Sequence, residues 1–128
     1  MKTSDVIIVG SGASGLFNAL FLPQDYKVIV ITKKEVEESD SFLAQGGISA
    51  LKNPEDYDSY FEDTMKAGHY ENDKGAVEKM IKESPQIIQD LKDFGVRFDL
   101  KDGEIEFTRE GGHSTFRILH HEDLTGKE

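Results

Sequence analysis

The first thirty residues alternate between apolar runs and turn residues in the order strand, helix, strand. Val6–Val9 are four consecutive β-branched residues, which is typical of a parallel strand buried on both faces. A helix is predicted roughly from Gly12, because residues 16–22 are amphipathic. After a turn at residues 23–25, residues 27–31 are a second strand candidate, apolar from Val28 to Ile31. This spacing predicts a parallel βαβ unit with a right-handed crossover.

Helical periodicity follows in the middle of the chain. Apolar side chains recur on one face over residues 56–68, which predicts a helix that ends at Gly68. Residues 73–94 show the same spacing, interrupted by Ser84-Pro85. Since serine is a common N-cap and proline is favoured at the first helical position, this pair predicts two helices with a bend.

The last third of the chain carries weaker signals. Residues 96–98 and 104–108 alternate in polarity around Lys101-Asp102-Gly103, which indicates a hairpin. In the tail we expect one extended segment and a helix that opens at residues 123–126. A doubly wound sheet needs more parallel strands than the two found here. We therefore predict an α/β fold over residues 1–128 that is the N-terminal part of a longer protein.

A glycine-rich turn joins the first predicted strand to its helix. Gly10, Gly12 and Gly15 have the spacing Gly-x-Gly-x-x-Gly. Such glycines allow a tight turn and a close backbone approach to a pyrophosphate, and the helix N-terminus attracts its charge. A glycine turn without a ligand is the alternative, but the strand before the turn and the helix after it favour a dinucleotide.

The end of the second predicted strand lacks the acidic residue that holds the ribose in NAD-dependent dehydrogenases. Thr32 and Lys33 stand there instead. The threonine could bond a hydroxyl, and the lysine could meet a phosphate, cover the adenine, or lie free in solvent. This weakens the prediction of an NAD dehydrogenase. A second glycine pair, Gly46-Gly47, follows a long polar connection and would let backbone approach a flat ring; a glycine turn before a short helix is the alternative.

Composition narrows the possible functions. The 128 residues carry a formal net charge of −10, which argues against nucleic-acid binding. There is no cysteine, so disulfides, iron–sulfur clusters and thiolate zinc sites are excluded within this segment. His113, His120 and His121 have no compact ligand spacing, and we expect no metal. No apolar run approaches membrane-spanning length, so we expect a cytoplasmic protein without membrane contact.

Several motifs together resemble the flavoprotein family of succinate dehydrogenase, fumarate reductase and aspartate oxidase. They are the glycine loop, Thr32-Lys33, Ala44-Gln45-Gly46-Gly47, and the runs at residues 109–114, 117–120 and 123–126. The resemblance covers nearly the whole chain in the right order. It implies a Rossmann-like FAD-binding unit within a larger flavoprotein fold. The cofactor-binding residues expected from it are Gly10, Ser11, Gly12, Ala13, Ser14, Gly15, Thr32, Lys33, Asp40, Ser41, Ala44, Gln45, Gly46 and Gly47.

Two positions resemble the aspartate-oxidising branch of that family. Asp40 stands where the membrane-bound members carry the histidine that joins FAD covalently, which implies non-covalent FAD. Glu110 matches the glutamate that orients an amino-bearing substrate, and a carboxylate suits an ammonium group. From residue type alone, an exposed loop acid is the favoured interpretation of Glu110, and the resemblance to the family reverses that preference.

The resemblance implies oxidation of L-aspartate to iminoaspartate, with oxygen or fumarate as electron acceptor. The product would enter quinolinate and NAD synthesis, which suggests a functional link to quinolinate synthase. The family's substrate-capping domain and catalytic arginine lie downstream of this region, so we expect the segment alone to be inactive. A soluble fumarate reductase and a non-catalytic nucleotide-binding module are the alternatives.

Overall fold

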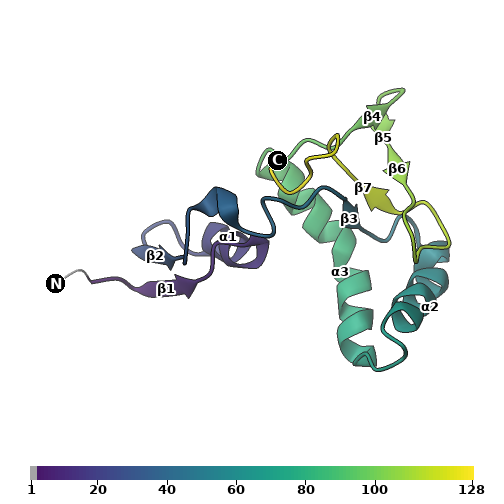
Figure 1. The fold of residues 1–128 in the computed structure, drawn as a ribbon, viewed down its shortest axis with the longest axis horizontal. Helices are drawn as coiled ribbons and strands as arrows, with labels where there is room; N and C mark the ends of the chain where they lie inside the picture. The colour runs from purple at the N-terminus through teal and green to yellow at the C-terminus, as the bar shows by residue number, and fades with distance from the viewer. Residues whose placement is uncertain (1–2) are drawn as a thin grey trace.

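A parallel βαβ unit forms one end of the molecule (Figure 1). The computed structural model describes residues 3–128. The unit comprises β1 (Val6–Val9), α1 (Ala13–Phe21) and β2 (Val28–Ile31), and the two strands pair in parallel along their whole length. The predicted order of strand, helix and parallel strand is therefore confirmed.

The expectation that β1 is buried on both faces is wrong for this chain. Ile7 and Val9 are 58% and 83% exposed, whereas Val6 and Ile8 are half-buried. Within residues 3–128, β1 and β2 form a sheet of two strands, and α1 is the helix in contact with β1. The helix covers one face of the strand, so the apolar side chains of the other face are left in solvent.

Two long helices build the other end of the molecule. After a 3-10 turn at Val36–Glu38 and the short strand β3 (Ile48–Ser49), a second 3-10 turn (Pro54–Asp56) leads into α2 (Tyr57–Ala67). The side chain of Asn53 accepts a hydrogen bond from the backbone N–H of Asp56 at 3.0 Å and so begins this turn. The predicted helix over residues 56–68 is confirmed, with Gly68 at its C-cap.

The second long helix, α3 (Lys74–Asp93), runs without interruption through Pro85, so the predicted division into two helices is wrong. Proline has no N–H to donate to the carbonyl of Ile81 one turn earlier. The hydroxyl of Ser84 donates to that carbonyl at 2.7 Å instead, and it accepts from the backbone N–H of Leu51 at 2.8 Å. Ser84 thus replaces the bond that proline removes, which keeps the helix continuous.

Ser84→Ala is expected to destabilise the protein by about 1–3 kcal/mol, because the Ile81 carbonyl and the Leu51 N–H both lose a buried partner. In a Pro85→Ala background the loss is smaller, since the introduced alanine would supply the missing backbone donor to Ile81. Urea unfolding of the four proteins in this double-mutant cycle measures the difference. Equal losses in both backgrounds would contradict the role given to Ser84.

The C-terminal third forms short antiparallel strands. β4 (Leu100–Lys101) and β5 (Glu104–Ile105) make the predicted hairpin around Asp102-Gly103. β6 (Phe107–Thr108) and β7 (Ile118–Leu119) join β3 in a sheet of order β3-β7-β6, which confirms the extended segment expected in the tail. Residues 96–98 are not a strand.

The expected helix at residues 123–126 is a series of turns instead. Leu124 N–H donates to the carbonyl of His121 at 3.1 Å, and Gly126 N–H donates to the carbonyl of Ala44 at 2.9 Å. Because the Gly126 amide bonds a distant loop, it is directed away from a helical partner. The tail therefore packs on the loop before β3.

Two apolar clusters lie against α3. One contains Ala50, Ile88, Phe98 and Leu119, and the other contains Tyr60, Met65, Val77 and Ile81. The first cluster places β3 and β7 beside α3, and the second places α2 beside α3. No helix within residues 3–128 is long and apolar enough to cross a membrane.

Candidate functional site

The glycine loop has the geometry that a dinucleotide-binding turn requires. Gly10 has φ of +111°, a conformation that other residues rarely adopt. A Cβ on Gly15 would collide with the carbonyl oxygen of Gly10 and would lie 3.3 Å from the Ile8 side chain. Gly12 is the N-cap of α1 and has no side chain to cover the helix end. The N–H of Ala13 donates to Ser41 Oγ, and the other backbone N–H groups at this positive end of the helix are suited to an anion.

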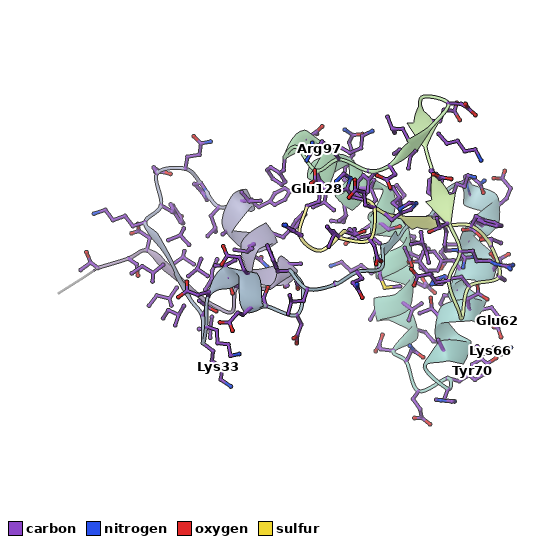
Figure 2. All side chains as sticks on the ribbon, turned by 45° about the horizontal axis from the view of Figure 1, so that its top comes forward. Lys33, Glu62, Lys66, Tyr70, Arg97 and Glu128 are labelled. Atoms are coloured by element: carbon purple, nitrogen blue, oxygen red, sulfur yellow. The ribbon has the colours of Figure 1, made fainter. Side chains whose placement is uncertain are left out.

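Of the two residues after β2, Thr32 lies beside this loop. Ser11, which is buried, donates its hydroxyl proton to Thr32 Oγ1 at 3.0 Å, and Gly10 N–H donates to the carbonyl of Ile31 at 2.8 Å. The Thr32 hydroxyl keeps its own proton for a further acceptor. Lys33 is exposed and extends from the βαβ unit into solvent (Figure 2).

Ser41 brings the second predicted segment to the glycine loop. Its Oγ accepts a hydrogen bond from the backbone N–H of Ala13 at 3.0 Å. A Cβ on Gly12 would lie only 3.1 Å from that oxygen. Segments 28 residues apart therefore meet at the first turn of α1. Asp40, next to Ser41, and Ser14 are exposed.

The Ala44–Gly47 segment is held between the tail and β7. Besides the bond from Gly126 to Ala44, Gln45 Nε2 donates to an Asp123 carboxylate oxygen at 3.3 Å. A Cβ on Gly47 would overlap the carbonyl oxygen of Leu119, so glycine is required for this approach of two backbones. The tail motif thus fixes the loop that was predicted to lie against a flat ring.

Glu110 lies directly beside this segment. A Cβ on Gly46 would be 3.4 Å from Oε1 of Glu110 and 3.6 Å from its Oε2. Glu110 itself is exposed. The structure therefore brings the predicted substrate-orienting acid to the predicted flavin-facing glycines, although 64 residues separate them in the sequence.

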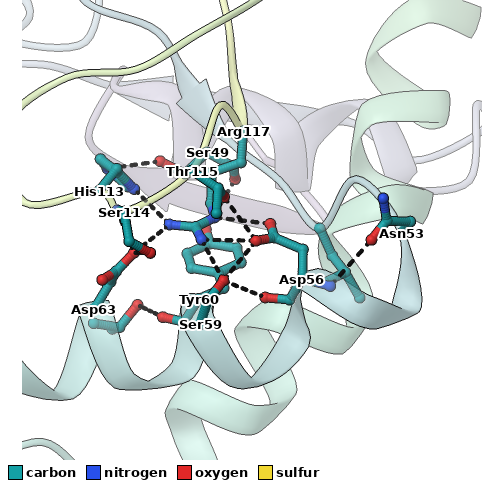
Figure 3. Close-up of polar contacts among 12 residues, drawn as sticks. Ser49, Asn53, Asp56, Ser59, Tyr60, Asp63, His113, Ser114, Thr115 and Arg117 are labelled. Carbon is teal, nitrogen blue, oxygen red and sulfur yellow. Dashed lines mark hydrogen bonds and ion pairs between the residues drawn. The ribbon is translucent and has the colours of Figure 1, made fainter.

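A buried arginine, Arg117, is linked through Asp63 to Ser114 in the loop that carries Glu110 (Figure 3). It was not among the site residues predicted from the sequence. Arg117 is fully buried. Its Nε and Nη2 donate to the two oxygens of Asp56 at 2.9 and 2.8 Å, and its Nη1 donates to Asp63 at 2.6 Å. The carboxylate of Asp63 also accepts from the backbone N–H and hydroxyl of Ser114 at 2.7 Å each.

These contacts keep the cluster charged. The hydrogen bonds from Arg117 are the largest influence on Asp56 and hold the pKa of its carboxyl far below the ordinary 3.8. Burial alone would raise the pKa of Asp63, but the bonds from Ser114 and Arg117 outweigh it and lower that pKa. The hydrogen bond to Asp56 in turn raises the pKa of Arg117. One feature of the sequence points to the burial of Arg117: it directly precedes the apolar pair Ile118-Leu119, which forms a buried strand.

His113 lies at the edge of this cluster. Its Nδ1 is 3.2 Å from Arg117 Nη1, and its Nε2 is 3.4 Å from Ser49 Oγ. It also lines an open groove of about 650 Å³ between α2, α3 and the segments around Gly47 and Gly111. The segment that ends at Gly47 and the segment from Gly111 to His113 therefore line the same groove.

His120 and His121 contact acidic side chains away from the groove. Nδ1 of His120 and Nδ1 of His121 lie 3.2 and 3.3 Å from the carboxylate of Asp99. In the part of the chain that the structure describes, no group of three histidine, aspartate or glutamate side chains is arranged to hold a metal ion.

Comparison with known proteins agrees with this geometry. Residues 5–127 match the model of the FAD binding domain family. The chain is 44% identical to an L-aspartate oxidase of Clostridium perfringens over 98% of its length, and 46% identical to that of Clostridium acetobutylicum over 97%; it spans 29% of each relative. A quinol–fumarate reductase structure superposes with a TM-score of 0.87 at 27% identity, covering 99% of this chain and 23% of that one.

These findings confirm the predicted cofactor class and the resemblance to fumarate reductase and aspartate oxidase flavoproteins. The chain spans less than a third of the length of the curated relatives it matches. The match of nearly every residue and the geometry of the glycine loop lead to the same conclusion: the chain belongs to the FAD binding domain family.

Proposed function

We propose that this chain is the N-terminal FAD-binding part of an enzyme that oxidises L-aspartate to iminoaspartate. The observation that carries the proposal is the position of Glu110, whose carboxylate lies against Gly46 of the Gln-Gly-Gly segment. A carboxylate placed there can hold the ammonium group of an amino acid next to a flavin ring. The L-aspartate oxidases similar to this chain support the choice of substrate.

The residues of the chain fit an FAD molecule held at two places. The glycine loop would hold the pyrophosphate. The absence of a side chain at Gly15 lets α1 begin close to β1, and this brings the start of the helix to the position where the motif binds a pyrophosphate. Thr32 and Lys33 would contact the ribose and the adenine end, and Ala44–Gly47 would face the isoalloxazine. With Asp40 in place of a histidine, the cofactor would be held without a covalent bond.

When bound, FAD supplies the acceptor for the hydride of the substrate. Glu110 would orient the ammonium group, and the closely packed Gly46-Gly47 backbone would let the ring lie near it. Residues outside this chain would complete the substrate site and deliver oxygen or fumarate as the acceptor. The cytoplasmic location, the place in NAD synthesis and the functional link to quinolinate synthase are parts of the same proposal.

A fumarate reductase is the second candidate, favoured by the superposition on a quinol–fumarate reductase. Fumarate and succinate have no ammonium group, so Glu110 would place a negative charge beside a dicarboxylate. The carboxylate at this position is therefore the feature that separates the two candidates.

Glu110→Gln in the full-length protein is expected to raise the KM for L-aspartate about 10–100-fold, since it replaces a charged hydrogen bond worth about 1.5–3 kcal/mol. Steady-state oxidation of L-aspartate measures the change. Glu104→Gln, an exposed acid in the hairpin β4–β5, is the matched control and leaves KM unaltered. An unchanged KM in the Glu110 variant would remove the main support for an amino-acid substrate.

A further inference from the structure

The guanidinium of Arg117 uses every one of its N–H donors. Nε bonds Asp56, Nη2 bonds Asp56 and Ser59, and Nη1 bonds Asp63 and His113. A guanidinium has donors only and keeps its proton in proteins. Each partner must therefore accept, and this requirement extends to the imidazole.

His113 must accept through Nδ1, which lies 3.2 Å from Arg117 Nη1. A nitrogen that accepts carries no proton, so the proton of the neutral ring is on Nε2. This Nε2–H is directed at the hydroxyl of Ser49, and the distance from Nε2 to Ser49 Oγ is 3.4 Å. The opposite tautomer would set two donors against each other at Arg117.

The same arginine ties three segments of the candidate site together. Its guanidinium lies over the ring of Tyr60, 4.8 Å from the centroid, and the Tyr60 hydroxyl donates to the backbone carbonyl of Ser49 at 3.1 Å. Ser49 is two residues after Gly47 in the segment beside Glu110. Through Asp63, the arginine also fixes both polar groups of Ser114. The loop that carries Glu110 is thus held to α2 and β3.

We infer that Arg117 is a positioning residue: it holds His113 as the Nε2–H tautomer and aligns the Glu110–Ser114 loop with Gly46-Gly47. A loop fixed in this way presents Glu110 without having to be ordered by the substrate. His113 and Ser49 both line the groove between α2 and α3, so their Nε2–Oγ pair lies at its wall. The consequence for the substrate rests on the proposed function, whereas the tautomer does not.

The test is a nitrogen NMR spectrum of the FAD-loaded full-length protein labelled with ¹⁵N-histidine. His113 signals are assigned by their loss in His113→Gln. We expect the wild-type spectrum to show protonated Nε2 and unprotonated Nδ1. Protonation of Nδ1 in the wild-type protein would overturn the inference, whatever the substrate proves to be.

Arg117→Lys keeps the positive charge, but a single ammonium group cannot replace the planar guanidinium that bonds Asp56, Asp63 and His113 at the same time. We expect this variant to lose the single-tautomer signature and to raise the KM for L-aspartate about tenfold. Arg97→Lys is the matched control, because Arg97 is exposed and pairs with Glu128 away from the loop. A folded Arg117→Lys protein with the wild-type His113 signals would overturn the inference.

Should Arg117→Lys fail to fold, Asp63→Asn provides the second variant, since it keeps the pair between Arg117 and Asp56. It weakens the anchor of Nη1 and of Ser114, so the His113 signals are expected to shift toward mixed tautomers. Unchanged signals there would equally overturn the inference. If L-aspartate proves not to be the substrate, the NMR comparison still decides the role of Arg117.

Discussion

Gly15→Val is expected to abolish FAD binding, with affinity lowered at least about 100-fold. A Cβ at this position would collide with the carbonyl oxygen of Gly10 and press on the side chain of Ile8. The start of α1 would have to move away from β1, which would displace the N–H groups that we propose bind the pyrophosphate. Flavin absorbance retained after gel filtration, and a titration of the apoprotein with FAD, measure the loss.

Gly75→Ala is the matched control for this change. Gly75 lies in the first turn of α3, where a Cβ would meet one atom, Oδ1 of Asp73, at 3.3 Å. Because that atom belongs to the N-cap side chain of α3 and lies outside the glycine loop, this variant should keep its FAD. Normal FAD binding by Gly15→Val would show that the glycine loop is not the pyrophosphate site.

Asp56→Ala is expected to destabilise the protein by about 3–5 kcal/mol, because it leaves a fully buried guanidinium without its main partner. Asp56 accepts two bonds from Arg117 and one each from Ser59 and Thr115. All four would be lost at once. Urea unfolding monitored by circular dichroism gives the change in the free energy of unfolding.

An exposed ion pair is the control for Asp56. Glu78 and Lys82 lie one turn apart on the outer side of α3, with 3.2 Å between Oε2 and Nζ. Glu78→Ala is expected to change the free energy of unfolding by no more than about 0.5 kcal/mol. A similarly small effect of Asp56→Ala would mean that Arg117 finds other partners, which would contradict the network drawn in Figure 3.

The βαβ unit and the helix α2 could be predicted from the sequence because their signals are local. β-branched runs, glycine spacing and helical periodicity each act within one element. The continuous course of α3 could not be predicted, since it depends on a hydroxyl of Ser84 that bonds both the Ile81 carbonyl and a distant backbone N–H at Leu51. The same tertiary effect turned residues 123–126 into turns that bond the loop at Ala44.

For the candidate site too, local motifs could be recognised in the sequence, whereas contacts between distant residues could not. Motifs indicated the glycine loop, Ala44–Gly47 and Glu110, but only the fold shows that Glu110 lies beside Gly46. The cluster around Arg117 was missed, because Asp56 in the 3-10 turn and Asp63 on α2 look like ordinary surface acids. Their partner is more than fifty residues away in sequence, and no local pattern joins them.

The measurement that tests the central claim most directly is an anaerobic absorption spectrum of the FAD-loaded full-length protein. Addition of L-aspartate is expected to bleach the flavin band, whereas addition of succinate at the same concentration should leave it unchanged. Since oxygen is absent, bleaching reports electron transfer from substrate to flavin alone. A protein that binds no FAD, or a flavin that succinate bleaches and L-aspartate does not, would contradict the account.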